Sequence, residues 1–86
     1  MYIGKVIGNV VATKKDSRLV GSKLLIVCPL VRDSKEKDTM VVAVDAVGAG
    51  IGEVVLVVKG STARAALGID APIDAAIVGI VDTMEV

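Results

Sequence analysis

A glycine-rich run over residues 48–52 is the first feature of this sequence that could do chemistry. Such a turn after a strand can hold a pyrophosphate, provided that a third glycine and then a helix follow. Here Glu53 stands where the third glycine would be, and residues 54–58 are apolar and mostly β-branched, which predicts a strand. The sequence therefore argues against a nucleotide site. It favours a tight turn with positive φ at one or more glycines, or a loop that packs closely against a neighbouring chain.

A second candidate site lies where Gly60, Ser61 and Thr62 precede Arg64. Free N–H groups at a helix start and a guanidinium could together bind an anion. The simpler interpretation is a short helix capped by Ser61 or Thr62, with Arg64 paired to a carboxylate, on this chain or on another subunit. We favour the capped helix.

Residues suited to catalysis are few. The chain has no histidine, which removes imidazole acid-base chemistry, histidine triads and histidine metal sites. Its single cysteine, Cys28, lies among apolar residues and is expected to be a buried thiol that cannot hold zinc alone. Scattered carboxylates show no spacing typical of a two-carboxylate mechanism; they include Asp45, Asp70, Asp74 and Asp82. We therefore expect no enzyme activity, no cofactor and no metal.

Charge and composition restrict the partners. Ten basic residues balance ten acidic ones and Tyr2 is the only aromatic residue, so the chain lacks both the charge and the stacking side chains of a nucleic-acid binder. Hydrophobic residues make up 53% of the 86 positions, but charges, glycines or prolines interrupt every run before it could span a membrane. Because one small core cannot bury so much apolar surface, copies of the chain are expected to associate.

The elements that must position these residues are mainly strands, because valine and isoleucine dominate the apolar runs. Gly4 and Gly8 share one face of the first strand by period-two counting, which predicts a sharp bend. We predict a single domain, residues 1–86, that is mainly β: a small five-stranded OB-like barrel with one short helix between the fourth and fifth strands. The expected strands cover residues 2–13, 23–31, 40–47, 53–59 and 75–83, and the helix runs from residue 61 or 62 to residue 67, before Gly68 in a left-handed conformation.

The fourth expected strand, residues 53–59, has apolar side chains on both faces. In a monomeric barrel one of these faces would meet water, so the pattern predicts a second surface that another subunit buries. The charged run 32–39 predicts a solvated, mobile loop. The competing hypothesis is an OB-type module that binds a small ligand or an anion; it predicts polar residues on one barrel face and a stacking side chain, and the sequence offers little of either.

Several stretches together resemble the bacterial microcompartment vertex proteins, the family that includes EutN and CcmL. They cover nearly the whole chain, and the turn from Asp45 to Glu53 is the most specific of them. The stretches are residues 8–15, 21–27, 44–53, 60–61, 63–64 and 80–82. The resemblance implies a homo-pentamer, formed through a head-to-tail interface, that caps the five-fold vertices of a polyhedral shell in the bacterial cytoplasm. Its partners would be hexameric shell proteins, among which the ring introduces curvature.

The resemblance also implies which residues make contacts. A closed ring satisfies the apolar surplus without forming filaments, and a six-membered ring remains an alternative. Lys14 and Lys15, at the end of the first strand, are candidates for contact with shell tiles, although two solvated lysines explain them equally well. The turn residues expected at the subunit interface near the ring axis are Gly48, Ala49, Gly50, Gly52 and Glu53, and Ser61 and Arg64 are expected to add further subunit contacts.

Overall fold

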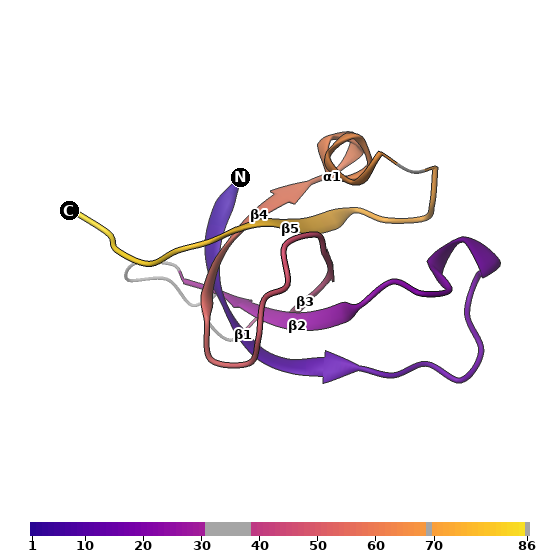
Figure 1. The fold of residues 1–86 in the computed structure, drawn as a ribbon, viewed down its shortest axis with the longest axis horizontal. Coiled ribbons are helices and arrows are strands. Elements are labelled where there is room, and N and C mark those ends of the chain that lie inside the picture. Colours follow the sequence, from indigo (N-terminus) through magenta and orange to yellow (C-terminus); the bar gives the residue numbers. More distant parts are fainter. Residues whose placement is uncertain (31–38, 69, 86) are drawn as a thin grey trace.

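The computed structural model of the chain describes residues 1–30, 39–68 and 70–85. Over these residues the fold is mainly β, with five strands and one α-helix between β4 and β5, as the sequence predicts (Figure 1). The loop expected at 32–39 lies, apart from its last residue, outside the described residues. The strands are β1 Tyr2–Val10, β2 Leu24–Pro29, β3 Val41–Asp45, β4 Val54–Lys59 and β5 Ala75–Ile80; the α-helix α1 is Ser61–Leu67, and a 3-10 turn, η1, is Ser17–Leu19.

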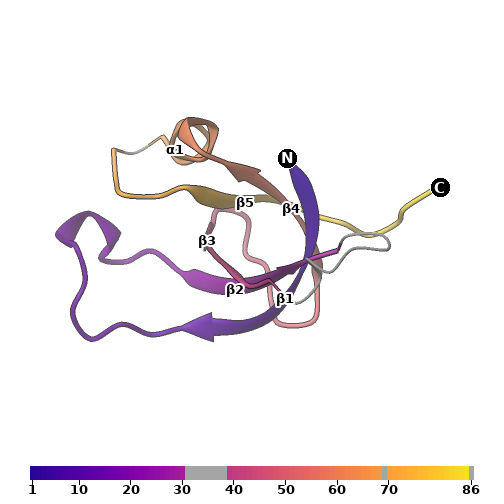
Figure 2. The ribbon, with the colours of Figure 1, turned by 180° about the vertical axis from the view of Figure 1, so that it is seen from behind.

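The strands close into a barrel in the order β1-β2-β3-β5-β4, which confirms the predicted OB-like architecture. β3 and β5 pair in parallel, and the other neighbours pair antiparallel. Closure gives each described strand a partner on both sides, although β3 and β5 pair only through Val44 with Ala76 and Asp45 with Ile77. Figures 1 and 2, seen from front and back, both place α1 on one side of the barrel and the tip of the β3–β4 connection on the opposite side.

The strands are shorter than predicted, and a local feature lies beside three of their ends. β1 stops at Val10 instead of residue 13, and beyond it the Lys15 ammonium donates to the Ala12 carbonyl (3.0 Å) in a turn. β2 stops at Pro29, although the Leu30 N–H still donates to the Ile3 carbonyl of β1 (2.9 Å). β3 stops at Asp45, whose side chain accepts the N–H groups that follow. Where a strand ends depends on side-chain hydrogen bonds and on strand pairing, and the pattern of apolar residues in the sequence does not predict either.

β1 also carries a β-bulge, and it corrects one prediction. The register with β2 shifts between Val6 and Gly8. A Cβ at Gly4 would collide with the Val27 side chain, whereas a Cβ at Gly8 would meet Ile26 at 3.5 Å. Consecutive residues of β2 face opposite ways, so the prediction that Gly4 and Gly8 share a face is wrong. Glycine at position 4 is needed because β1 and β2 approach closely there.

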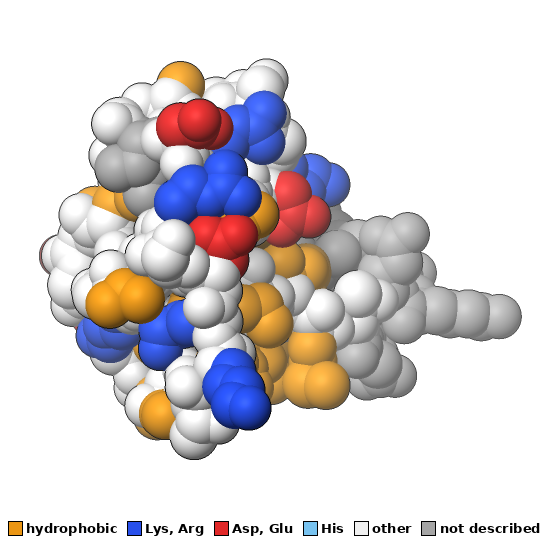
Figure 3. All heavy atoms as spheres, turned by 90° about the vertical axis from the view of Figure 1, so that its right-hand side faces the viewer, with side chains coloured by type: hydrophobic (Ala, Val, Ile, Leu, Met, Phe, Trp, Pro, Cys, Tyr) orange, Lys and Arg blue, Asp and Glu red, His pale blue; other side chains and the backbone are white. Residues whose placement is uncertain are grey.

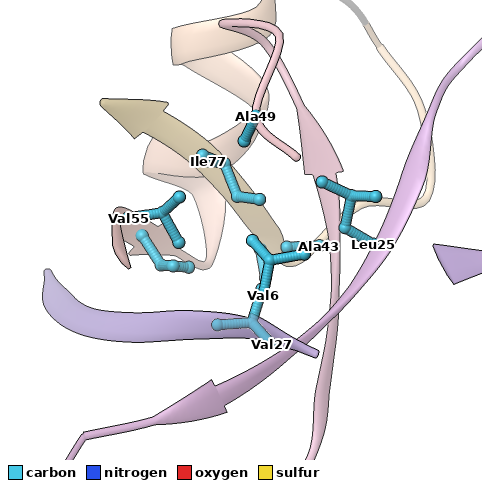
Figure 4. Close-up of a cluster of buried hydrophobic side chains, with 9 residues drawn as sticks. Val6, Leu25, Val27, Ala43, Ala49, Val55 and Ile77 are labelled. Atoms are coloured by element: carbon cyan, nitrogen blue, oxygen red, sulfur yellow. The ribbon is translucent and has the colours of Figure 1, made fainter. Parts of the chain in front are cut away.

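The barrel interior is filled by small and branched side chains that come from every strand (Figure 4). Ala49, from the β3–β4 connection, also belongs to this cluster and points toward Ile77. Cys28, expected to be buried, is only half-buried and lies opposite Lys5 in the β1–β2 pairing. The interior cluster consists of Val6, Leu25, Val27, Ala43, Ala49, Val55, Val57, Ala75 and Ile77.

A second apolar layer lies outside the barrel, beneath α1. Val58 of β4 is 6% exposed and packs there with the α1 residue Ala63, which is 0% exposed. The second apolar face of β4 was expected to be covered by another subunit, and for Val58 this expectation is wrong because the chain's own helix covers it. Val54 and Leu56 on the same face stay half-buried.

The two ends of α1 differ in how well the sequence predicts them. Gly60 is the N-cap and no side chain caps the helix, so the predicted cap by Ser61 or Thr62 is wrong. At the other end Gly68 has φ 67° and ψ 24°, and its N–H donates to carbonyls of the last helical turn, as predicted.

Tyr2 yields a first testable prediction. Its hydroxyl is buried and has no hydrogen-bond partner among the described residues, and burial, followed by the nearby Asp74 carboxylate, raises the Tyr2 pKa. A buried hydroxyl without a partner costs stability, so Tyr2→Phe should raise the free energy of unfolding by about 1 kcal/mol. Urea unfolding followed by circular dichroism, at one protein concentration, measures this difference. A loss of stability would mean that the hydroxyl has a partner in the assembled protein.

Candidate subunit interface

The 46–53 loop joins β3 to β4, and Asp45 organises its first half. The Asp45 side chain is 2% exposed. One of its oxygens accepts the N–H groups of Val47 (3.1 Å) and Gly48 (3.2 Å), and the other accepts that of Ala49 (2.9 Å). An aspartate that binds the N–H groups just after it starts a turn, and the negative charge strengthens each of these bonds.

Glu53 and β1 organise the second half of the loop. The Gly50 N–H donates to the Glu53 carboxylate (2.7 Å), and the Glu53 N–H donates to the Gly50 carbonyl (3.2 Å). Main-chain bonds of 2.8 Å from Gly52 to Val6 and 2.9 Å from Val6 to Glu53 fasten this half to β1. The loop is therefore a fixed part of the barrel wall.

The glycine pattern of the loop is explained by its backbone. Gly48 has φ 83° and Gly52 has φ 93°, values that side chains with a Cβ rarely adopt, which confirms the predicted positive φ. At Gly50 a Cβ would lie 3.4 Å from the Glu53 carboxylate, which is close to an ordinary contact, so the backbone requires glycine less strictly there. The glycines thus serve a tight turn, as expected.

The side chains of the loop divide between the core and the surface. Ala49 is 0% exposed, so it can affect a neighbouring subunit only through the loop that it anchors. Val47 and Ile51 point the other way, with 41% and 67% of their surface exposed. A rigid loop that displays two apolar side chains is a suitable contact for another protein surface.

Lys23 connects this loop to the start of β2. Its ammonium donates to the Ala49 carbonyl at 2.6 Å and lies 3.6 Å from the Asp45 carboxylate. The Lys23 side chain is half exposed, so the ammonium keeps access to water while it neutralises a nearly buried carboxylate.

The other predicted subunit contacts, Ser61 and Arg64, lie on α1 and so on the other side of the barrel from the loop tip (Figures 1 and 2). Ser61 is exposed. Within the described residues Arg64 forms no ion pair with a carboxylate of its own chain, and its guanidinium donates to the Ile73 carbonyl at 3.3 Å. The expected ion pair with another subunit stays a prediction. The structure therefore brings the turn residues together and keeps Ser61 and Arg64 apart from them.

Lys14 and Lys15 are exposed in the segment between β1 and η1, which lies at the right-hand end of the molecule in Figure 1. The following residues are ordered by an ion pair between Asp16 and Arg18 (3.0 Å). Hydrogen bonds from the Arg18 side chain and N–H hold the Asp16 pKa at about 2, below its usual value. The two lysines thus stand at a structured end of the molecule.

A shallow apolar groove opens at the same end, which Figure 3 faces; hydrophobic side chains gather there beside Lys, Arg, Asp and Glu. Its volume is about 200 Å³. Pockets for small ligands usually measure about 300–1,000 Å³ and contain several polar groups, whereas Asp74 is the only charged residue among the described residues that line this one. The groove does not favour a ligand-binding module. Its lining is Leu19, Leu24, Val42, Val44, Pro72, Ile73, Asp74 and Ala75.

The described residues contain neither a cluster of metal ligands nor a membrane-spanning helix. No cluster of His, Cys, Asp and Glu within them could hold a metal ion. No helix in this part of the chain is long and apolar enough to cross a membrane.

The sequence predictions missed four residues of this site. Asp45 stands before a glycine-rich turn, the usual place for an aspartate that binds backbone N–H groups, so its role could have been predicted. Val47 and Ile51 could not be assigned from the sequence, because an apolar residue beside a glycine does not show whether its side chain faces the core or the solvent. Lys23 gave no signal, since only the fold brings it to Ala49.

Comparison with known proteins identifies related chains. The family model described as "Ethanolamine utilisation protein EutN/carboxysome" matches residues 1–82. The chain is 54% identical over 86 residues to the bacterial microcompartment shell vertex protein GrpN of Rhodospirillum rubrum, covering 99% of this chain and 97% of that one. It is 45% identical over 89 residues to the shell vertex protein PduN of Salmonella typhimurium, with 98% of each chain covered.

A carboxysome protein and a solved structure complete the comparison. The carboxysome shell vertex protein CcmL of Synechocystis is 47% identical over 87 residues, covering all of this chain and 87% of the relative. The structure described as the GrpN pentameric microcompartment shell protein from Rhodospirillum rubrum superposes with a TM-score of 0.87 at 51% identity, and both chains are covered completely.

Proposed function

Because this chain belongs to the EutN/CcmL family of microcompartment shell vertex proteins, we propose that it forms a pentameric ring that caps the five-fold vertices of a bacterial microcompartment. The observation that carries this function is the full-length similarity to GrpN, whose structure is described as pentameric. Its role is structural: five-fold tiles among hexameric ones give a flat protein sheet the curvature that closes it. The protein is a component of a shell in the bacterial cytoplasm.

The layout of the chain supports a head-to-tail ring. Such a ring needs two different surfaces on each subunit, one for each neighbour. The 46–53 loop and the start of α1 are two surfaces of this kind, on different sides of the barrel (Figure 1). We assign the first to Gly48, Ala49, Gly50, Gly52 and Glu53, near the ring axis, and the second to Ser61 and Arg64.

The related proteins are structural shell components, and we extend this to the present chain as a protein that catalyses no reaction and uses no cofactor. Its partners are other copies of itself and hexameric shell proteins, without nucleic acid or membrane. The balanced charge and the single aromatic residue support this choice of partners. The whole chain, residues 1–86, acts as one domain. An OB-type ligand-binding module is not favoured, because neither the relatives nor the groove supports it.

Native mass spectrometry of the purified protein tests the ring. Five chains of 8.8 kDa give about 44 kDa, which is well separated from other stoichiometries. A pentamer supports the proposal. A hexamer would be consistent with membership of the family but would contradict the five-fold geometry. A stable monomer would favour a ligand-binding barrel instead.

Lys14 and Lys15 give a prediction about shell contact. Reversing both charges, Lys14→Glu with Lys15→Glu, should leave the native mass of the ring unchanged but reduce its incorporation into shells, since like charges across an interface oppose association. Co-purification with a hexameric shell protein measures incorporation. Equal incorporation of the variant and the wild type would mean that the two lysines are simply solvated.

A further inference from the structure

We propose that Asp45 and Lys23 are positioning residues for ring assembly: they hold the 46–53 loop in the shape that presents Val47 and Ile51 to the next copy of the chain. This inference rests on the proposed pentameric function. It adds residues outside the turn itself, and it adds the two exposed apolar side chains of the loop to the contact that the turn residues make.

Asp45 is fixed before it binds the loop. Its own N–H donates to the Lys23 carbonyl (2.9 Å), and the next N–H, of Ala46, donates to the Ile77 carbonyl (3.2 Å). The backbone at the end of β3 is thus bonded to the residue just before β2 on one side and to β5 on the other. A carboxylate on this fixed backbone sets the positions of the Val47, Gly48 and Ala49 N–H groups.

Lys23 completes the arrangement at the Ala49 peptide units. The Ala49 N–H donates to the Asp45 carboxylate at 2.9 Å, and the Ala49 carbonyl accepts from the Lys23 ammonium at 2.6 Å. Ala49 is therefore held by charged groups at both its donor and its acceptor, while its methyl group is packed in the core. Val47 and Ile51 lie two positions before and after Ala49. Because Ala49 is held in place, the directions in which the Val47 and Ile51 side chains point are fixed as well.

A fixed loop matters because association costs conformational entropy. Each flexible segment that must be ordered at an interface weakens binding, and a segment ordered beforehand avoids that cost. The exposed apolar side chains of this loop, Val47 and Ile51, can then meet a neighbour without reordering. The barrel itself does not need them, since both point away from the core.

The test replaces the carboxylate with an amide. Asp45→Asn keeps the size of the side chain, but its amide group must turn a donor toward at least one of the three N–H groups. We expect the barrel to remain, and the protein concentration at which half the chains are in rings to rise by at least about tenfold. Sedimentation velocity over a dilution series measures that concentration, and circular dichroism checks the barrel.

Two variants of Lys23 separate the role of its charge from that of its apolar stem. Lys23→Arg keeps a donating cation and should assemble close to the wild-type concentration, whereas Lys23→Met keeps the apolar stem and should shift assembly in the same direction as Asp45→Asn. The matched control is Asp16→Asn, because Asp16 also accepts a backbone N–H (2.9 Å, from Arg18) but stands outside the loop. This control should leave the ring unchanged.

The outcomes separate this inference from the proposed function. Recovery of the ring by Asp45→Asn at higher protein concentration supports positioning when the dilute single chains also show the barrel spectrum, because association by itself can stabilise a poorly folded chain. Assembly of Asp45→Asn and Lys23→Met at the wild-type concentration would overturn the inference, and so would loss of the barrel in both. A wild-type protein that is itself monomeric would instead remove the proposed function.

Discussion

Ile51→Asp should convert the ring to single chains. In the free subunit 67% of the Ile51 surface is exposed, on a loop that its hydrogen bonds make rigid. Losing the burial of this side chain costs each interface roughly 2–3 kcal/mol, and an unpaired carboxylate enclosed in its place adds a further penalty. Every interface of a ring carries the same change, so the effect is repeated at each contact.

Native mass spectrometry and circular dichroism together measure this result. The expected protein has one chain's mass of 8.8 kDa and a β spectrum. Val11→Asp is the control, because Val11 is also apolar and is 84% exposed but lies outside the loop. A ring that persists in Ile51→Asp would contradict the assignment of the loop to the interface, whereas a ring lost equally in both variants would indicate a general effect of added charge.

Gly4→Ala should be the most damaging single change to the barrel. Its Cβ would collide with the Val27 side chain and lie 3.2 Å from the Cys28 carbonyl oxygen. Val27 is 0% exposed and has no room to move away. Overpacking of this kind costs typically 1–3 kcal/mol, and we expect about 3 kcal/mol here because backbone as well as side chain is in the way. In a domain of this size that lowers the Tm by roughly 15 °C.

Gly8→Ala is the matched control in the same strand. A Cβ at position 8 meets only Ile26, at 3.5 Å, which is an ordinary contact. Thermal unfolding of both variants and the wild type at one protein concentration should give a large loss of Tm for Gly4→Ala and a small change for Gly8→Ala. Equal changes in the two variants would show that the close approach of β1 and β2 at Gly4 is not what requires glycine.

The barrel could be predicted because its signals are local. Valine and isoleucine in each apolar run indicate strands, and glycines at the turn between β3 and β4 indicate positive φ, which Gly48 and Gly52 adopt. Gly68 likewise ends α1 as predicted. These features depend on residues within a few positions of one another, so a single sequence contains them.

The errors concern contacts between distant segments. Val58 is covered by α1, not by another subunit, because the helix folds back over β4. The bulge in β1 comes from its register with β2 and reverses the direction in which Gly8 faces. Lys23 meets Ala49 only in the closed barrel. Period-two counting cannot report any of these, since each is decided by pairing or packing elsewhere in the chain.

Electron cryo-microscopy of shells assembled from this protein and a hexameric shell protein of the same bacterium tests the central claim most directly. The account predicts closed shells in which a pentamer of this chain occupies the five-fold corners, and open or elongated assemblies when it is left out. Closed shells whose corners lack the chain, or rings of it within the flat facets, would contradict the vertex function.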